Sequence, residues 1–257
     1  KITFFSKINF KKYDFIHSHM FRADLYIFWH NLFLKKSNIN ISTVHSMVKQ
    51  DLLDRYGYFQ SVLFSRVWLM AWSRMNKIVV LSDVALDYYR KLLPSEVSKL
   101  VKINNGRDVD MSHLPSDFKL LQERVNKYKQ DGKIVVGTCC SVRQIKGLSQ
   151  IVEALIKDES LVFFLVGDGP ELENIKKVAF NSGVDSRLLS IGRKQNAYHY
   201  MPLFDVYVMP SLSEGFGLAL LEAVALKNKV VCSDLPIFKE AFTENEITFF
   251  ILNDIDS

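Results

Sequence analysis

Residues 209–226 read MPSLSEGFGLALLEAVAL, a stretch that combines the end of a strand, a glycine-containing turn and a helix. An apolar run ends at Met209, a turn with Pro210 follows, and a helical pattern begins at Leu218. Free backbone N–H groups and the helix dipole converge at such a junction, so an anion can bind there. The stretch therefore predicts an anion site at a helix start.

Two carboxylates, Glu214 and Glu222, flank this turn. Carboxylates repel phosphate, but they accept hydrogen bonds from hydroxyl groups beside it. A phosphate with hydroxyls on either side describes a nucleotide sugar. The alternative is a surface helix whose first glutamate favours the dipole and whose second is solvated, and this stretch alone does not separate the two.

Apolar segments rich in β-branched residues alternate with helical patterns along the whole chain. We expect strands over residues 13–19, 40–45, 77–82, 99–104, 133–140, 160–166, 188–191, 205–209, 229–232 and 247–252. We expect helices over residues 21–34, 51–75, 83–93, 147–157, 171–180, 197–203, 218–226 and 236–242. This alternation predicts parallel sheets covered by helices on both faces, with ligands at the carboxyl ends of the strands.

The chain changes character over residues 108–132, which are polar and contain Pro115 and one charged amphipathic stretch, 118–129. We therefore expect two Rossmann-like, doubly wound domains, 1–115 and 116–257. The sequence opens with Lys1 rather than Met, so we also expect upstream residues to be missing and the first domain to be incomplete. Whether such a fragment is active by itself is then an open question.

Composition excludes several classes of protein. Of the 257 residues, 48% are hydrophobic and 24% charged, which is typical of a globular protein with a substantial core. The three cysteines, Cys139, Cys140 and Cys232, form neither a disulfide framework nor a CxxC metal motif, and they indicate a reducing compartment, the cytoplasm. There is no signal-peptide pattern and no apolar run of about 18 residues that would span a membrane.

Charge is divided unevenly between the two halves. Residues 1–130 carry 21 Lys and Arg against 11 Asp and Glu, whereas residues 131–257 carry 12 against 17. A basic half can face nucleic acid, an anionic membrane surface or an anionic acceptor, or it can simply be a lysine-rich solvated surface.

A cationic loop follows the strand expected at 133–140. Residues 137–147 read GTCCSVRQIKG and carry Arg143 and Lys146. At the carboxyl end of a parallel strand these cations can neutralise a diphosphate, although two solvated loop cations are the simpler interpretation in isolation. A second phosphate-suited segment, 214–217, at the same predicted edge favours the diphosphate.

Two glycine turns and three histidines also stand at expected strand ends. Gly167 lies in GDGP directly after an expected strand, where glycine permits close approach of a ligand; the turn lacks a full GxGxxG fingerprint, and a plain strand-to-helix turn is the simpler explanation. Gly192 and Arg193 follow a short expected strand, where they could contribute to a base-binding pocket or form an exposed basic turn. His17, His19 and His45 close two strands of the first half. Without a further ligand their spacing does not suit a metal, so they are structural residues or hydrogen-bond donors and proton carriers.

The segment PSLSEGFGLALLEAVALKNKVVCSD, 210–234, resembles the E-x7-E signature of the retaining glycosyltransferases of family 4, which have the GT-B fold. Glu214 and Glu222 stand at the two signature positions. Further segments similar to this family follow in its order: 14–19, 43–45, 80–82, 103–108, 141–147, 164–170 and 205–211. The segment 103–108 reads INNGRD where the family has IPNGVD, so Arg107 replaces an apolar residue.

The resemblance implies two Rossmann-like domains facing a cleft and transfer of a hexose from a nucleotide sugar, UDP-linked by expectation, with retained anomeric configuration and without a metal ion or other cofactor. It assigns catalytic roles to His45, Glu214, Arg143 and Lys146 and an acceptor-side role to His19. The residues assigned to donor binding are Gly167, Gly192, Arg193, Gly215, Phe216, Gly217, Leu218 and Glu222.

The implied partners are the nucleotide sugar, a glycan or lipid-linked acceptor of bacterial surface polysaccharide or lipopolysaccharide synthesis, and an anionic membrane at the inner face of the cytoplasmic membrane, with no nucleic acid. Two alternatives stay open at this point. One is a nucleotide-sugar epimerase of the same architecture, and the other is a non-catalytic sugar-binding fragment.

Overall fold

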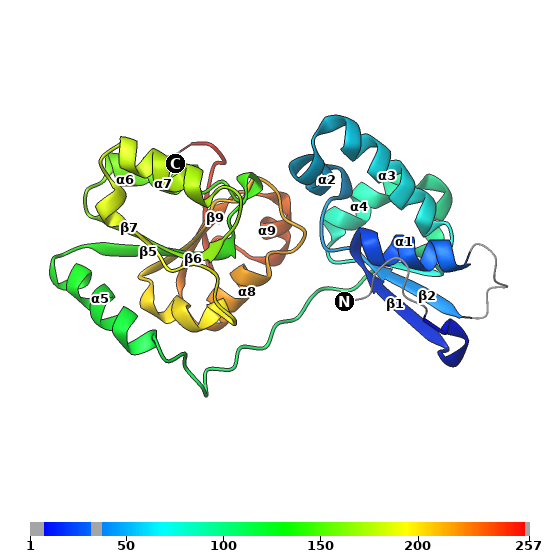
Figure 1. The fold of residues 1–257 in the computed structure, drawn as a ribbon, viewed down its shortest axis with the longest axis horizontal. Coiled ribbons are helices and arrows are strands. Elements are labelled where there is room, and N and C mark those ends of the chain that lie inside the picture. The colour runs from blue at the N-terminus through cyan, green and yellow to red at the C-terminus, as the bar shows by residue number, and fades with distance from the viewer. Residues whose placement is uncertain (1–7, 32–37, 255–257) are drawn as a thin grey trace. The chain divides into compact units, whose positions relative to one another are not determined.

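The chain folds into two compact units, each with its own parallel sheet and its own core (Figure 1). The computed structural model describes residues 8–31 and 38–254. The first unit comprises Lys1–Asn105 with Glu214–Phe216, and the second comprises Gly106–Ser213 with Gly217–Ser257. The contacts thus divide the chain between Asn105 and Gly106, whereas the sequence pattern suggested a boundary at 115.

The sheet of the first unit has four parallel strands in the order β1-β2-β3-β4. Its strands are β1 Phe15–His19, β2 Ile39–Thr43, β3 Lys77–Val80 and β4 Leu100–Lys102. Its helices are α1 Met20–Asn31, α2 Val48–Tyr56, α3 Tyr58–Trp72 and α4 Asp83–Leu92, with 3-10 turns η1 Phe10–Lys12 and η2 Pro94–Lys99. The expected alternation is confirmed, and residues 32–34 of the first expected helix lie outside the described residues.

The expected helix over 51–75 is wrong in one respect, because the structure has two helices there. Gly57 has φ 76°, and its N–H donates to Leu53 O at 3.0 Å to end α2. Only glycine adopts this backbone conformation readily, so the chain turns at Gly57 and restarts as α3. The apolar helical pattern continues across the glycine and hides this break.

The sheet of the second unit has six parallel strands in the order β10-β9-β8-β5-β6-β7. Its strands are β5 Ile134–Ser141, β6 Leu161–Asp168, β7 Leu188–Ser190, β8 Val206–Met209, β9 Lys229–Ser233 and β10 Thr248–Phe250. Its helices are α5 Phe118–Gln130, α6 Ser149–Lys157, α7 Leu172–Asn181, α8 Leu218–Ala225 and α9 Pro236–Ala241, with 3-10 turns η3 Gln144–Lys146, η4 Asp185–Arg187 and η5 Ala197–Leu203. This is the doubly wound strand order of a dinucleotide-binding sheet, as expected.

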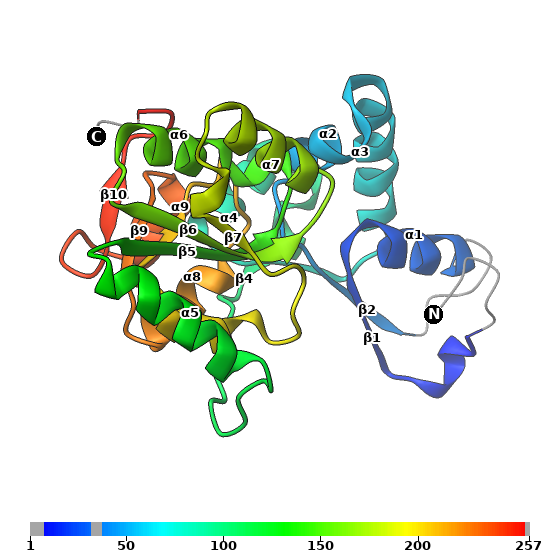
Figure 2. The same ribbon diagram turned by 60° about the vertical axis from the view of Figure 1, so that its left-hand side comes forward.

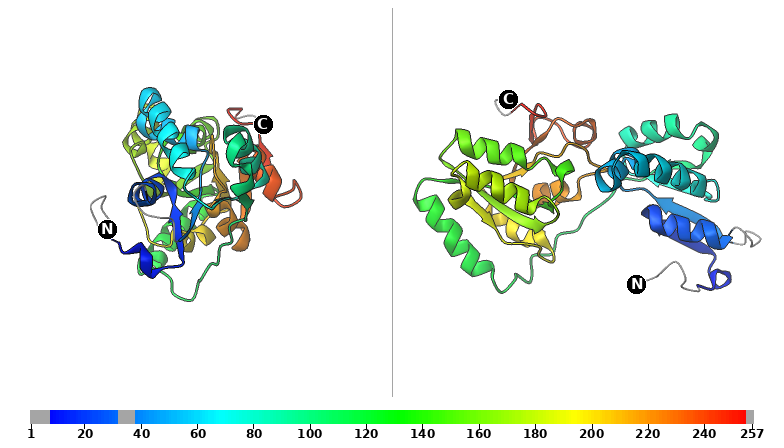
Figure 3. Two further views of the ribbon diagram at one scale, coloured as in Figure 1. Left: turned by 90° about the vertical axis from the view of Figure 1, so that its right-hand side faces the viewer. Right: turned by 45° about the horizontal axis from the view of Figure 1, so that its top comes forward.

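Two apolar clusters cover the faces of this second sheet. Helices α6 and α7 lie on one face, and α5 and α8 lie on the other (Figure 2). Alternate residues of β6 show the division, because Phe163 packs with the α6–α7 cluster and Phe164 packs with the α5–α8 cluster. Figure 3 gives further views of both sheets with their helices. Each strand of the sheet centre is therefore buried on both faces, which explains its continuous apolar sequence.

The core of the first unit is aromatic. Trp68 and Trp72 of α3 and Tyr89 of α4 are almost fully buried, and the rings of Trp72 and Tyr89 meet edge to face. The hydroxyl of Tyr89 accepts the N–H of Val48 at 3.1 Å, so it caps the start of α2. Aromatic packing and a buried hydroxyl cap together hold three helices of this unit on its sheet.

Candidate functional site

The carboxyl edge of the second sheet brings together the two segments expected to hold a diphosphate. Strands β5 and β8 are neighbours, with Val136 paired to Val206, and the sheet order reverses between them. Beyond the strands, the N–H of Leu212 donates to Ile145 O at 2.8 Å. The loop with Arg143 and Lys146 is therefore joined directly to the loop after β8, at the topological switch point where ligands of such sheets bind.

Gly147 makes this close approach possible. Its φ is 61°, and a Cβ at this position would lie 2.1 Å from Pro210 O. The side chain of Gln150 donates to the same carbonyl at 3.0 Å. Arg143 precedes the 3-10 turn η3, Lys146 is its last residue, and both are half-buried. Two cations on a turn at this edge can supply the charge that a diphosphate requires.

Gly167 is the penultimate residue of β6 and Gly192 lies just after β7. The packing around Gly167 shows the simpler structural role. A Cβ on Gly167 would lie 1.9 Å from Cys140 O, so strand packing alone requires glycine there. The N–H of Gly167 donates to Gly192 O at 2.9 Å. Arg193 is exposed, and Lys194 next to it forms an ion pair with Asp117 at 2.5 Å. Donor binding by Gly167, Gly192 and Arg193 stays a prediction.

Helix α8 begins without a side-chain cap. Gly217 precedes it with φ 82°, and Leu218, its first residue, is 40% exposed. Free N–H groups at this start can receive an anion, as the sequence suggested. The three residues before Gly217 behave differently, because Glu214, Gly215 and Phe216 group with the first unit. Glu214 and Glu222 therefore belong to different units.

Glu222 of α8 has a partner that the sequence did not assign. Arg107 Nε donates to Glu222 Oε1 at 2.5 Å, and the Arg107 guanidinium lies 5.5 Å from the centre of the Tyr198 ring. Glu222 is only 9% exposed. The one signal in the sequence was that Arg107 stands where the similar family segment carries an apolar residue.

Three histidines gather at the carboxyl edge of the first sheet. His19 Nδ1 and His45 Nε2 are 2.9 Å apart, the rings of His17 and His19 are centred 4.4 Å apart, and His17 Nε2 lies 2.7 Å from Thr43 Oγ1. Parallel pairing of β1 with β2 places these residues together, as their positions at strand ends predicted. Within the described residues, no group of three or more His, Cys, Asp or Glu is arranged to hold a metal ion.

The imidazoles of His17 and His45 favour the neutral form. Burial lowers the pKa of His45 below its ordinary value of 6.5, and the rings of His19 and His17 lower it further. Burial also lowers the pKa of His17, again with a contribution from His19. A neutral imidazole can both donate and accept hydrogen bonds, which suits contact with sugar hydroxyls.

A buried carboxylate beneath this cluster was not anticipated. Asp24 of α1 is 0% exposed and accepts hydrogen bonds from four side chains. The donors are Ser18 of β1, Ser42 of β2, Trp68 and Trp72. Since Ser18 lies between His17 and His19, this network fixes the strand that carries both histidines.

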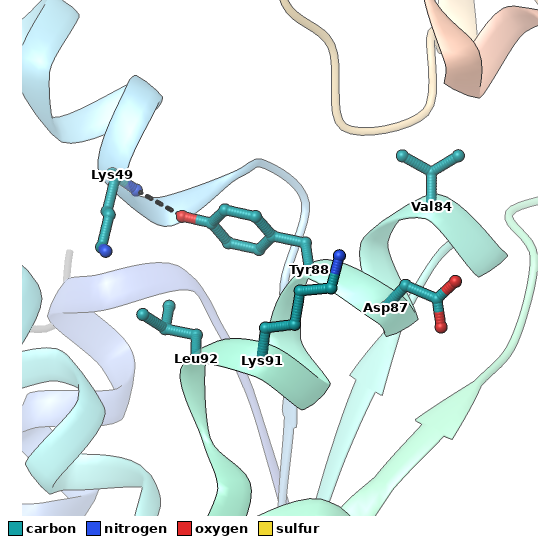
Figure 4. Close-up of a pocket in the computed structure, with 6 residues that line it drawn as sticks. All are labelled: Lys49, Val84, Asp87, Tyr88, Lys91 and Leu92. Atoms are coloured by element: carbon teal, nitrogen blue, oxygen red, sulfur yellow. Dashed lines mark hydrogen bonds between the residues drawn. The ribbon is translucent and has the colours of Figure 1, made fainter.

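A cavity of about 490 Å³ lies elsewhere in the first unit, between α2 and α4 (Figure 4). Its lining residues are Lys49, Val84, Asp87, Tyr88, Lys91 and Leu92. The Tyr88 hydroxyl accepts the N–H of Lys49 at 3.3 Å. None of the residues predicted from the sequence to form a site lines this cavity.

Two α/β units, each built on its own parallel sheet, are the architecture of GT-B glycosyltransferases. The chain belongs to the family of glycosyl transferases group 1, whose pattern it matches over residues 121–256.

The relatives agree with this assignment. The O-antigen biosynthesis glycosyltransferase WclY of Escherichia coli is 31% identical over 252 residues, a match that covers 96% of this chain and 68% of WclY. The UDP-Gal:alpha-D-GlcNAc-diphosphoundecaprenol alpha-1,3-galactosyltransferase of Escherichia coli is 24% identical, over 100% of this chain and 67% of the enzyme.

The fold has a close match among solved structures. The crystal structure of Anabaena HepE in complex with UDP-glucose aligns with a TM-score of 0.79 at 18% identity, over 96% of this chain and 67% of HepE. The chain thus spans about two thirds of the length of all three relatives.

Proposed function

We propose that this protein transfers a hexose from a UDP-sugar to a hydroxyl of a glycan or lipid-linked acceptor, with retention of configuration, as in family 4, and without a metal ion. The observation that carries the proposal is the junction of the η3 loop with the loop after β8, through the 2.8 Å bond from Leu212 N to Ile145 O. This junction assembles cations and a free helix start at one edge of the sheet.

In this reaction the bond from the anomeric carbon to the diphosphate breaks, and a bond to the acceptor oxygen forms as the acceptor hydroxyl loses its proton. Negative charge grows on the leaving diphosphate. Arg143 and Lys146 would balance this charge in place of a divalent cation, with the amides of Phe216, Gly217 and Leu218 adding to them. Electrostatic stabilisation of this kind is commonly the largest single contribution to catalysis.

The carboxylates and imidazoles would orient the substrates. Glu222 would accept hydrogen bonds from ribose hydroxyls, and Glu214 from hydroxyls of the donor sugar. His45 would contact the donor sugar through its neutral ring, with His19 on the acceptor side. Gly167, Gly192 and Arg193 would border the nucleotide.

The names of the relatives support the choice of donor and acceptor. HepE binds UDP-glucose, and the Escherichia coli galactosyltransferase uses a UDP-sugar and a diphosphoundecaprenol-linked acceptor. WclY acts in O-antigen biosynthesis. We extend these properties to the present chain, and propose that it acts in synthesis of a surface polysaccharide at the inner face of the cytoplasmic membrane.

Nucleotide binding tests the phosphate site. The protein should bind UDP more tightly than GDP or ADP in isothermal titration calorimetry. Lys146→Ala should weaken UDP binding by about tenfold or more, since it removes a charge-assisted contact. Lys177→Ala, an exposed lysine of α7, is the matched control. Unchanged UDP affinity in Lys146→Ala would contradict the charge-balancing role, and turnover that stops with EDTA and returns with a divalent ion would contradict the metal-free reaction.

Contact with a membrane is part of the proposal and is supported by helix α3. No helix within the described residues is long and apolar enough to cross a bilayer. The outer face of α3 nevertheless carries Phe59, Leu63 and Met70, which are 87%, 58% and 51% exposed. Arg66 lies on the same exposed face. An apolar stripe with a cation beside it suits the interface of an anionic membrane.

The inner face of α3 is as unusual as the outer one, because Ser61 and Ser65 are buried there while large apolar side chains are exposed.

The double variant Phe59→Ser, Leu63→Ser should lose cosedimentation with phosphatidylglycerol vesicles, and phosphatidylcholine vesicles should bind the wild-type protein weakly. Phe180→Ser, a 71% exposed residue of α7, is the control. Equal sedimentation of the double variant and the wild-type protein would rule out α3 as the docking face.

A further inference from the structure

Arg107 reaches Glu222 from the irregular segment between β4 and α5, across 115 positions of sequence. The ion pair is 2.5 Å long, and the side chains of Arg107 and Glu222 are 38% and 12% exposed. The contact lies entirely within the second unit. Such a long-range pair fastens the irregular segment to the helix that follows the anion-binding turn.

The Arg107 guanidinium is held from two sides. Its Nε bonds Glu222 Oε1, and its planar group lies 5.5 Å from the centre of the buried Tyr198 ring. Arginine combines a directed hydrogen bond with stacking on an aromatic ring, which lysine does not reproduce. The position of Arg107 is therefore set before any ligand arrives.

Only one of the two carboxylate oxygens of Glu222 accepts a hydrogen bond from the described residues. Among the described residues, Oε1 has the Arg107 partner, whereas Oε2 has no hydrogen-bond partner. A mostly buried carboxylate needs a compensating cation, and one with a vacant oxygen can still accept a hydroxyl. Arg107 thus neutralises Glu222 and leaves an acceptor beside the diphosphate edge.

We propose that Arg107 is a positioning residue for the nucleotide ribose, which it recognises indirectly by fixing Glu222. This inference rests on the proposed function, in which Glu222 accepts hydrogen bonds from the ribose. Held through Oε1, the Glu222 carboxylate has one rotamer and presents Oε2 to the 2′- and 3′-hydroxyls. The pair also carries no net charge, so it does not repel the neighbouring diphosphate.

The test compares UDP with 2′,3′-dideoxy-UDP, which lacks both ribose hydroxyls, by isothermal titration calorimetry. Arg107→Met keeps the length of the side chain and removes the cation, Arg107→Lys keeps the charge, and Arg124→Met, an exposed arginine of α5, is the matched control. Arg107→Met should weaken UDP binding about tenfold and leave dideoxy-UDP within about twofold of wild type. Arg107→Lys should recover part of the preference for UDP, and Arg124→Met should match wild type.

Each other outcome has a definite meaning. Unchanged UDP affinity in Arg107→Met, or an equal loss for both nucleotides in Arg107→Met and Arg107→Lys, would overturn the positioning role. If Glu222→Gln discriminates between the two nucleotides as well as the wild type does, the ribose contact is wrong and the inference falls with it. A wild-type protein that binds neither nucleotide would refute the proposed function itself. Thermal melts of every variant separate loss of folding from loss of binding.

Discussion

Asp24 of the first unit and Glu222 of the second are both carboxylates on helices and both are buried, at 0% and 9% exposure. Their surroundings differ sharply. Within residues 8–31 and 38–254, Asp24 accepts hydrogen bonds from four side chains, whereas Glu222 accepts one, from Arg107. Asp24 is fully buried, whereas Glu222 has one carboxylate oxygen, Oε2, without a hydrogen-bond partner in the described part of the chain.

This difference separates a structural carboxylate from one available to a ligand. Burial alone does not make the distinction, because both groups are buried. The number of hydrogen-bond donors that the fold supplies makes the distinction. A carboxylate whose oxygens already accept hydrogen bonds from the protein has no free acceptor for a ligand. Asp24 should therefore control stability and Glu222 should control ligand affinity.

The largest expected effect is that of Asp24→Ala. It leaves the indole N–H groups of Trp68 and Trp72 buried without an acceptor, so we expect a loss of about 3 kcal/mol or more in the free energy of unfolding of the first unit. Urea denaturation followed by tryptophan fluorescence measures it, because Trp29, Trp68 and Trp72 all lie in that unit. Asp14→Ala, an exposed carboxylate, is the control and should change stability by less than about 0.5 kcal/mol.

The second effect is on binding. Glu222→Ala should weaken UDP affinity by about tenfold, or about 1.4 kcal/mol, because it removes the acceptor for the ribose. Its unfolding free energy should change by less than about 1 kcal/mol, since the partner Arg107 is 38% exposed and can be hydrated. Isothermal titration calorimetry measures the UDP affinity, and thermal denaturation measures the change in stability. If Glu222→Ala were destabilised by several kcal/mol and yet bound UDP as tightly as the wild type, Glu222 would be a structural carboxylate like Asp24.

Ser42→Ala offers a graded test of the Asp24 network. It removes one of four donors, at 2.8 Å from Asp24 Oδ2, and leaves Trp68 and Trp72 in place. We expect a loss of about 1 kcal/mol in unfolding free energy, measured as for Asp24→Ala. A loss as large as that of Asp24→Ala would mean that the donors act as one cooperative unit.

The smallest effect concerns pH. Burial and neighbouring rings lower the pKa of His17 and His45 below 6.5 in the folded protein. At these two side chains the unfolded chain therefore binds more protons than the folded protein. Their contribution to the stability of the first unit is fully present above about pH 6.5 and is lost as the pH drops through the lowered pKa values. His45→Gln should flatten this dependence in denaturation series from pH 7.5 to 5. An equally steep dependence in His45→Gln would show that other groups cause it.

Much of this architecture could be predicted from the sequence, because local patterns determine it. The alternation of apolar strands with helices predicted both parallel sheets. The positions of His17, His19 and His45 at strand ends predicted that these histidines lie on one edge of the first sheet. The junction of the Lys146 loop with the loop after β8 followed from the same rule. That rule is general for parallel sheets, whose strand ends meet at one edge.

The parts that could not be predicted depend on contacts far apart in the sequence. Asp24 sits in an apolar helical pattern, and only the folded sheet and α3 supply its four donors. Arg107 lies in a segment without regular structure and meets Glu222 across 115 positions. The break at Gly57 is the local exception, since a single glycine interrupts a pattern that is otherwise helical on both sides.

The pairing of β5 with β8 also has a consequence for how the protein folds. These strands are neighbours at the centre of the second sheet, with Val136 beside Val206, although β6 and β7 intervene in the chain. Closing so long a loop is slow, because the entropy of the intervening chain is lost before the pairing contributes. The edge that carries Lys146 and the start of α8 is then completed late, so the proposed nucleotide binding at this edge would report that the whole unit has folded.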